Sequence, residues 1–277
     1  MTGVRIELSL KQAPALRVDL RGLLPSALAG LSVGEIERLP FGHGNRRVPL
    51  AEWFGVQRAD TQGEGAELRL SGDCSRFDRI GTQMLEGRLV VDGPVGDYAG
   101  AGLAGGEMRV AGDAGLLAAC EMAGGTLRID GNVGDFAAAA LPGSMDGMRG
   151  GLFIVQGHAG QRFGDRMRRG TALVFGNAGD FLASRLVAGT IGLGGRAGAH
   201  VGYGMRRGSV VLAAARCDVS PTFVPAIADV PVAWQLLARS LARHGGPFAM
   251  LATRRIVRHL GDLSAQGKGE LIFVEPD

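Results

Sequence analysis

With 277 residues, 46% of them hydrophobic, the chain can bury a sizeable core, so its 47 glycines do not indicate a disordered or collagen-like protein. The net charge of +3 and the aromatic content of 5% disfavour a nucleic-acid-binding surface built from basic and stacking side chains. Three cysteines without a Cys-x-x-Cys pair argue against a disulfide framework and against a zinc or iron–sulfur site in this chain.

The N-terminal sequence predicts neither export nor a membrane anchor. Residues 1–10 alternate in polarity and lack the apolar centre of a signal peptide. No stretch of about 18 apolar residues could span a bilayer. We therefore expect a soluble, cytoplasmic protein with three reduced and inert thiols.

Residues 1–61 are predicted to form an N-terminal cap. Val4–Leu10 has the alternation of a strand, residues 23–39 mix helix and loop, and the segment His43–Phe54 ends in two of the few large aromatic residues. A cap is expected because a stack of repeats leaves open strand edges at its ends, and such edges promote aggregation unless they are covered.

Residues 62–220 are predicted to form a repeat domain. The repeated sequence motif occurs in two very similar copies, GTLRIDGNVGDF at Gly125–Phe136 and GTALVFGNAGDF at Gly170–Phe181. Successive copies begin 19 residues apart, except for one interval of 26 residues that contains the insertion LPGSMDGMRG. The copies begin at Gly87, Gly106, Gly125, Gly151, Gly170, Gly189 and Gly208. A period near 20 residues is typical of a solenoid.

The residues within one repeat indicate the kind of solenoid. In Leu127–Ile129 alternate side chains are apolar, which is the spacing of a strand. A repeat of 19 residues is too short to contain a helix together with the segment that leads back to the next strand. The glycines suit corners where φ is positive. We therefore predict an all-β, right-handed parallel β-helix that advances about 4.8 Å per coil. A left-handed helix of hexapeptide repeats is the alternative, but its period of six does not divide 19.

A column of methionine and leucine supports this prediction. One such residue stands three positions before each starting glycine, and no helical heptad places it there. Stacked coils would turn the column into a buried ladder in a narrow core. Its members are Met84, Leu103, Met122, Met148, Met167, Leu186 and Met205.

Residues 221–277 are predicted to form a C-terminal helix and tail. In the helix, Val232, Leu236, Leu237 and Leu241 share one apolar face, and Gly245 ends it. A closing strand is expected at Gly269–Glu275.

We predict no catalytic residue and no metal ligand in the chain. The five histidines are scattered, and no nucleophile elbow or phosphate-binding lysine motif is present. Asp97, Asp135 and Asp180 recur in Gly-Asp-Tyr and Gly-Asp-Phe, which indicates turn stabilisation, because catalytic carboxylates are rarely repeated from coil to coil.

One basic column is the candidate binding site. Arginines follow the methionine column directly, and the two double-arginine positions are 38 residues apart, which places them about 10 Å from each other on one face. A solvated basic stripe is one interpretation, and a site for an anion or an acidic partner is the other. The candidates are Arg149, Arg168, Arg169, Arg206 and Arg207.

The coils, with the pattern Gly-x5-Gly-x2-Gly-Asp, resemble the C-terminal β-helix of the glutamate synthase large subunit. Together with HGNRRVPLAEWF at His43–Phe54 and GDLSAQGKGELI at Gly261–Ile272, they make the chain similar over nearly its full length to the C subunit of formylmethanofuran dehydrogenase.

The resemblance implies one of two complexes. One is a tungsten or molybdenum formylmethanofuran dehydrogenase of methanogens. The other is the formyltransferase/hydrolase complex of methylotrophic bacteria, which moves a formyl group from formyl-tetrahydromethanopterin to a methanofuran-like carrier and releases formate. Of the 30 basic residues all but Lys11 and Lys268 are arginine, which suggests a GC-rich bacterial genome and favours the second complex.

In either complex the resemblance implies that this chain is a non-catalytic structural subunit. The chemistry, the zinc and the methanofuran-like carrier would belong to partners: an amidohydrolase-like zinc subunit, a formyltransferase subunit and a further small subunit. Two alternatives stay open. A glutamate-synthase-type spacer would accompany flavin and glutaminase modules, and a polysaccharide-cleaving enzyme would need an acidic and arginine-lined groove.

Overall fold

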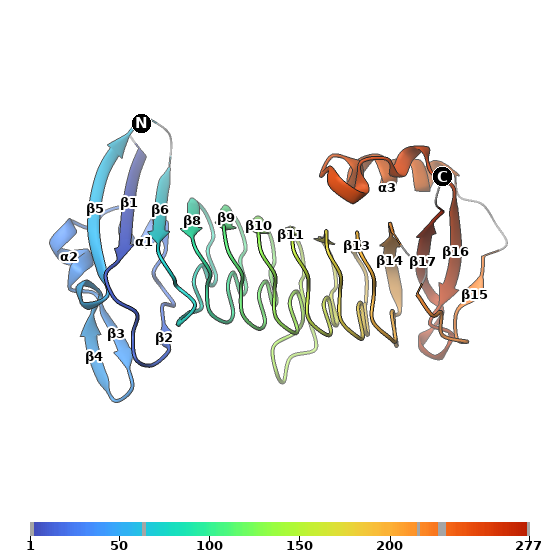
Figure 1. Cartoon of the computed structure of the whole chain (residues 1–277), viewed down its shortest axis with the longest axis horizontal. Coiled ribbons are helices and arrows are strands. Elements are labelled where there is room, and N and C mark those ends of the chain that lie inside the picture. The colour runs from blue at the N-terminus through green and yellow to red at the C-terminus, as the bar shows by residue number, and fades with distance from the viewer. Residues whose placement is uncertain (1–2, 63–64, 215–216, 227–230, 276–277) are drawn as a thin grey trace.

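The computed structural model describes residues 3–62, 65–214, 217–226 and 231–275, and within them a single sheet of 13 strands runs along the long axis (Figure 1). The predicted β-rich fold is confirmed. The strands lie in the order β15 (Val224–Pro225), β16 (Ile256–Gly261), β17 (Lys268–Val274), β14 (Arg207–Leu212), β13 (Thr190–Leu193), β12 (Thr171–Val174), β11 (Leu152–Val155), β10 (Thr126–Ile129), β9 (Glu107–Val110), β8 (Arg88–Asp92), β6 (Ala66–Ser71), β1 (Gly3–Leu10) and β5 (Phe54–Thr61).

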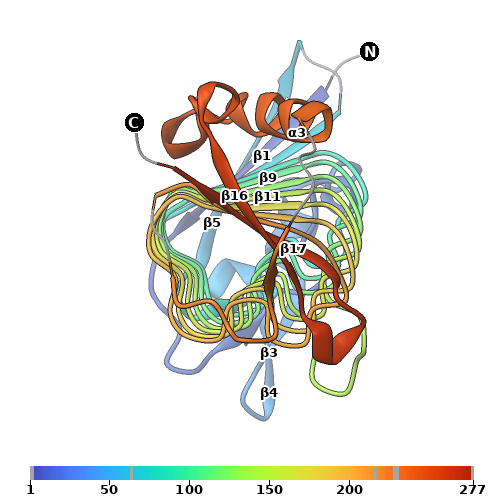
Figure 2. The ribbon, with the colours of Figure 1, turned by 90° about the vertical axis from the view of Figure 1, so that its right-hand side faces the viewer.

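The repeats form a stack of coils. Thr126 pairs in parallel with Glu107 of the preceding repeat and with Leu152 of the following one, so each strand lies one repeat from its neighbours. After each strand the chain turns and passes a second parallel ladder, which runs through Val95, Ala114, Val133, Ala159, Ala178 and Ala197. Seen along the axis, the coils lie over one another (Figure 2).

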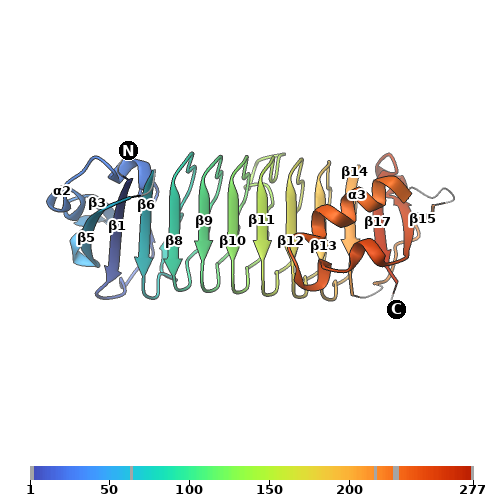
Figure 3. The same ribbon diagram turned by 90° about the horizontal axis from the view of Figure 1, so that it is seen from above.

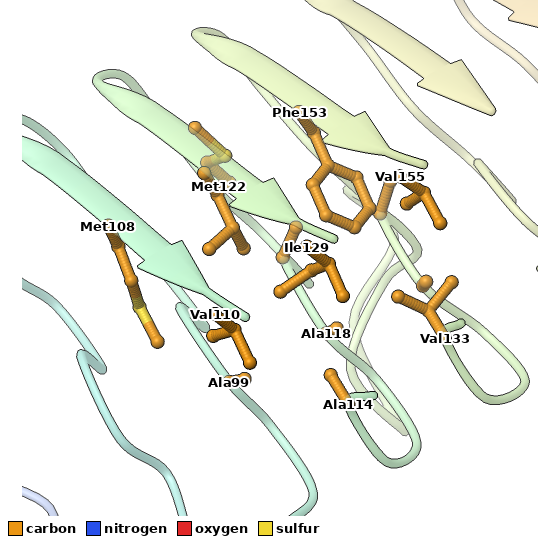
Figure 4. Packing of buried hydrophobic residues seen from close by; sticks show 14 of the residues in the cluster. Ala99, Met108, Val110, Ala114, Ala118, Met122, Ile129, Val133, Phe153 and Val155 are labelled. Atoms are coloured by element: carbon orange, nitrogen blue, oxygen red, sulfur yellow. The ribbon is translucent and has the colours of Figure 1, made fainter. Parts of the chain in front are cut away.

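The core is a narrow apolar column inside the coils. Leu127 and Ile129 are fully buried, and Ile129 points from its strand into a core that also contains Ala114, Ala118 and Val133 (Figure 4). All seven residues of the predicted methionine and leucine column are fully buried, with an exposed fraction of 0%. The alanines of this core, such as Ala118 and Ala138, leave space for the long, adaptable methionine side chains.

Glycine allows close contact between successive coils at several corners. A Cβ atom on Gly124 would lie 2.3 Å from the carbonyl oxygen of Ala104 in the preceding coil. The next residue, Gly125, has φ of +69°, and every other starting glycine also has a positive φ. Left-handed backbone is accessible to glycine at little cost, so the prediction of corner glycines is confirmed.

Polar side chains at the corners tie one coil to the next. The Oδ1 atoms of Asp97, Asp135 and Asp180 each accept a hydrogen bond from a backbone N–H of the following coil, at 2.7–2.8 Å. In a second column, Nδ1 of His158 accepts the N–H of Asn177 at 2.9 Å. These carboxylates are therefore turn-stabilising groups, as predicted.

The N-terminal residues cover one end of the stack. β1 pairs in parallel with β6 and antiparallel with β5, so the predicted strand at Val4–Leu10 is confirmed, whereas β5 was not predicted. This end also contains two short helices, α1 (Pro25–Leu28) and α2 (Val33–Glu37), and the 3-10 turn η1 (Leu50–Glu52). Two small strand pairs complete it: the hairpin of β3 (Pro40–His43) and β4 (Arg46–Pro49), and the parallel pair of β2 (Val18–Asp19) and β7 (Phe77–Asp78).

Helix α3 (Pro231–Ala242) lies on the outer face of the sheet near β13 and β14 (Figure 3). The predicted apolar face is wrong in part, because Val232 and Leu236 are 72% and 66% exposed. Leu241 is buried as predicted and Leu237 is partly buried, whereas Trp234 and Ala238 are buried in place of Val232 and Leu236. The helix is rotated because Trp234, Ala238 and Leu241 belong to one apolar cluster with the outer face of β11, β12, β14 and β17, which contributes Ile154, Leu173, Val211 and Ile272.

The chain closes with the 3-10 turns η2 (Gly246–Phe248), η3 (Leu251–Thr253) and η4 (Leu263–Ala265) and with β16 and β17. β17 pairs in parallel with β14, which confirms the predicted closing strand. The division into residues 1–61, 62–220 and 221–277 stays a prediction, since the sheet continues through all three ranges.

Candidate functional site

Four of the five predicted arginines line one open cavity of about 310 Å³. Arg149 lines neither this cavity nor the adjoining one described below, and its Nη2 atom donates to the carbonyl oxygen of Glu121 at 3.5 Å. The lining residues are Arg168, Arg169, Val187, Ala188, Arg206, Arg207 and Gln266.

A second cavity of about 190 Å³ adjoins the first, with Arg168, Val187 and Arg206 lining both. We call the two cavities together the arginine groove. Its walls come from outside the repeats, because Met145 belongs to the loop between β10 and β11, and Ala265 belongs to η4. This loop and the η4 turn project from the same side of the stack (Figures 1 and 2).

Two further arginines of the groove, Arg166 and Arg185, were not predicted. The carboxylate of Asp165, which is 3% exposed, accepts hydrogen bonds from Nε and Nη2 of Arg185 at 2.9 and 2.6 Å and from Oγ of Ser184 at 2.6 Å. The sequence contained a signal for this site, since Arg166 and Arg185 are one repeat apart.

The inserted loop is fixed to the groove by arginine. Nη1 of Arg166 donates to the carbonyl oxygen of Ser144 at 3.0 Å, and Nε of Arg168 lies 2.6 Å from Oδ1 of Asp146. Arg166, Arg168 and Arg185 therefore have partners in the chain, and they hold the walls of the groove in place.

The remaining guanidinium groups of the groove differ from these three in their side-chain contacts. Within the part of the chain that the structure describes, the side chains of Arg169, Arg206 and Arg207 form no ion pair and no hydrogen bond. Lys268 lies opposite Arg207 in the parallel pair of β14 and β17 and adds a further positive charge. Several cations side by side in an open cavity create a field that attracts anions.

The C-terminal wall is attached to the last coil through Asp262. Burial by itself raises the pKa of this carboxyl, but hydrogen bonds from Ser264 and from the backbone N–H of Gly204 outweigh burial and hold the pKa below its ordinary value. The side chain is therefore a charged acceptor that positions η4 beside the groove.

The described residues also bear on the requirements of a metal site, a reactive thiol and a membrane span. Among the described residues, no group of three or more His, Cys, Asp and Glu side chains could hold a metal ion. Burial raises the pKa of the Cys74 and Cys120 thiols to about 12 in both cases. None of the described helices has the length and apolar character to cross a membrane.

No family model matches the chain. It is similar to a chain in the crystal structure of the formyltransferase/hydrolase complex (FhcABCD) from Methylorubrum extorquens in complex with methylofuran. The two chains are 38% identical with a TM-score of 0.89, and the match covers 98% of this chain and 100% of the other.

Curated relatives match over shorter stretches. The C subunit of the tungsten-containing formylmethanofuran dehydrogenase 2 of Methanothermobacter wolfeii is 34% identical over 99 residues, and the match spans 35% of this chain and 36% of the relative. The C subunit of the formyltransferase/hydrolase complex Fhc of Methylorubrum extorquens is 40% identical over 81 residues, which is 29% of each chain. The chain thus covers about a third of the length of the curated relatives that it matches.

Proposed function

This chain belongs to the family that comprises the C subunits of formylmethanofuran dehydrogenase and of the formyltransferase/hydrolase complex, and from that membership we propose that it is a structural subunit of a formyltransferase/hydrolase complex. The observation that carries the proposal is the likeness along 98% of the chain to a component of such a complex. The complex would move a formyl group from formyl-tetrahydromethanopterin to a methanofuran-like carrier and release formate.

Within this proposal the chain organises its partners and performs no chemical step. Its partners would be a formyltransferase subunit, an amidohydrolase-like zinc subunit and a further small subunit, and the zinc and the carrier would be bound by them. The use of the recurrent carboxylates as acceptors for backbone N–H groups supports this assignment, since each of them already serves the fold.

The proposed architecture is a right-handed parallel β-helix with a cap at each end. Two parallel ladders that advance together by 19 residues, with positive φ at each starting glycine, support this interpretation. Such a stack gains length without gaining width, because each coil contacts only its neighbours. A long and stiff shape suits a subunit that holds two catalytic partners at a fixed separation.

Affinity purification of the tagged full chain from its source cells, followed by mass spectrometry, tests the proposal. We expect a formyltransferase and a zinc-dependent hydrolase to co-purify, and cells that express the tag alone provide the control. The purified complex should transfer and hydrolyse formyl groups, whereas the chain by itself should do neither. Turnover by the isolated chain would contradict the structural role.

The second candidate is the C subunit of a tungsten or molybdenum formylmethanofuran dehydrogenase, which the match to the archaeal relative favours. The same purification separates the two candidates. Recovery of a tungsten- or molybdenum-pterin protein in place of the hydrolase pair would assign the chain to the redox complex. Flavin and glutaminase partners would indicate a glutamate-synthase-type spacer instead.

A further inference from the structure

Strand β5 forms one edge of the 13-stranded sheet, with β1 as its single neighbour among the described strands. It pairs with β1 in an unbroken register of eight residues, from Phe54 opposite Leu10 to Thr61 opposite Gly3. Free edges are usually protected by a bulge, a proline or a lysine, because their unpaired backbone groups promote association with other strands. β5 contains none of these three. The N-terminal cap therefore covers the edge of the coils and creates a new edge of its own.

The alternation of hydrogen bonds shows which backbone groups of β5 face outward. The N–H of Lys11 donates to the carbonyl oxygen of Trp53 at 2.7 Å, which makes these two residues a hydrogen-bonded pair of the antiparallel register. Such pairs alternate with pairs that are not hydrogen-bonded, so the odd-numbered residues of β5 bond to β1. The N–H and C=O groups of Val56, Arg58 and Asp60 point away from β1, and within the described part of the chain they form no hydrogen bond with another segment.

The two halves of β5 differ in what covers them. In the first half, Phe54 is fully buried and Val56 is half-buried. Helix α2, with its buried Ile36, packs against the strand. In the second half, residues 57–60 are exposed, and this end of the strand, which bears the arrowhead in Figure 1, extends beyond α2. The second half is therefore the part of the edge that is open to another strand.

The hydrogen-bond alternation and the charges of β5 together select one pairing of this edge with itself. Outward-facing residues have to lie opposite each other in a hydrogen-bonded pair, so an even-numbered residue has to meet an even-numbered residue. A two-fold axis at Arg58 or at Asp60 would place like charges opposite each other, which is destabilising. An axis at Ala59 instead places Arg58 of each copy opposite Asp60 of the other, and an axis nearer the start of β5 would involve the half that is buried. The small Ala59 also suits a position on the axis, because backbones in a pair that is not hydrogen-bonded approach to about 4.5 Å.

From this geometry we propose that the chain self-associates through β5, as an antiparallel pair of residues 57–61 with a two-fold axis at Ala59. Arg58 and Asp60 of each copy would exchange backbone hydrogen bonds with the other, and the two sheets would become continuous. The side chains can form the same pairs, because Asp60 has no ion pair among the described residues and Arg58 donates through Nη2 to the carbonyl oxygen of Ala29 at 3.1 Å. An interface of five residues per copy is small, which predicts a weak dimer.

Sedimentation equilibrium of the purified full chain, from about 1 µM to about 200 µM, tests the proposal, and we expect a reversible equilibrium of monomer and dimer. Asp60→Arg and Arg58→Asp each turn both cross-strand pairs into like charges, so each should weaken the dimer about tenfold. The double variant Arg58→Asp/Asp60→Arg should restore dimerisation to within about twofold of the unchanged chain. Arg196→Asp is the matched control, because Arg196 is exposed on the stack and forms no ion pair among the described residues, and it should change the affinity by less than about twofold.

A second comparison separates strand pairing from a contact between charges alone. Asp60→Asn removes the charge and keeps the outward N–H, whereas Asp60→Pro removes both and leaves the hydrogen bonds between β1 and β5 in place. The proline variant should therefore dimerise more weakly than the asparagine variant, and circular dichroism checks that both are folded. A chain that stays monomeric at the highest concentration, a double variant that does not recover, an equal loss in Arg196→Asp, or equal dimerisation of the proline and asparagine variants would each overturn the proposal. Because the assay uses this chain alone, its outcome is independent of which partners co-purify.

Discussion

Replacement of Gly124 by alanine tests whether contact between coils dictates the recurrent glycines. The added Cβ would lie 2.3 Å from the carbonyl oxygen of Ala104 and 3.1 Å from its carbonyl carbon. Gly124 has no positive φ, so the substitution introduces a steric contact without a conformational penalty. Both atoms belong to backbone, which cannot move aside as the end of a side chain could.

The expected loss of stability follows from the local hydrogen bonds. Relief of the contact requires the two coils to separate by about 1 Å, because non-bonded heavy atoms are ordinarily well over 3 Å apart. Such a shift weakens the hydrogen bonds that Ala123 and Gly124 donate to the carbonyl oxygen of Leu103, at 2.7 and 3.1 Å. With about 1 kcal/mol for each bond and a further contribution from packing, we expect a loss of about 3 kcal/mol.

Substitutions at two other glycines distinguish the steric contribution to the loss of stability from the contribution of backbone conformation. Gly143 has φ of +86° and nothing within 4 Å of the added Cβ, so Gly143→Ala should lose about 1 kcal/mol from backbone conformation alone. Gly30 has open space and no positive φ, and Gly30→Ala should change stability by less than about 0.5 kcal/mol. Urea unfolding followed by circular dichroism measures all three variants. If Gly124→Ala were no less stable than Gly30→Ala, the contact argument would be wrong.

Two further predictions concern the corners and the thiols. His158→Asn should retain the native stability because an amide oxygen can accept the N–H of Asn177, whereas His158→Leu should lose about 1–2 kcal/mol in urea unfolding; equal stability of the two variants would show that this bond contributes nothing. Because burial raises the pKa of Cys74 and Cys120 to about 12, both thiols should resist iodoacetamide at pH 8 in the native chain, and their contribution to stability should hold below pH 9 and fall as the pH rises toward 12. Mass spectrometry that detected either label under native conditions would contradict this.

The regular part of the fold could be predicted because each coil repeats the same physical requirements. Gly125 occupies a corner with positive φ, Met122 is buried in the core, and Asp135 accepts a hydrogen bond from the following coil. Each requirement returns after 19 or 26 residues and is therefore visible as a column in the sequence. Periodicity revealed these roles without knowledge of any long-range contact.

The parts that could not be predicted depend on contacts between segments that share no period. The rotation of α3 follows from the apolar outer face of four strands, and the walls of the arginine groove come from an insertion and from the turn after β16. Asp165 was missed because its role depends on Arg185, which lies in the next coil and reaches back to it. The two arginines, Arg166 and Arg185, recur one repeat apart, but the carboxylate does not recur, because Ser184 occupies the position of Asp165 in the next coil.

The arginine groove lies where one column of the repeat changes character. Glycine occupies this column in three consecutive coils, because a Cβ would meet the backbone of the coil before it. The later coils have side chains there, alternately long and small, which both opens a cavity and surrounds it with positive charge. Ala188 shows that the fold accepts a small side chain at this position in the later coils, so folding alone does not require the arginines. From the first of these coils to the last, the column consists of Gly105, Gly124, Gly150, Arg169, Ala188 and Arg207.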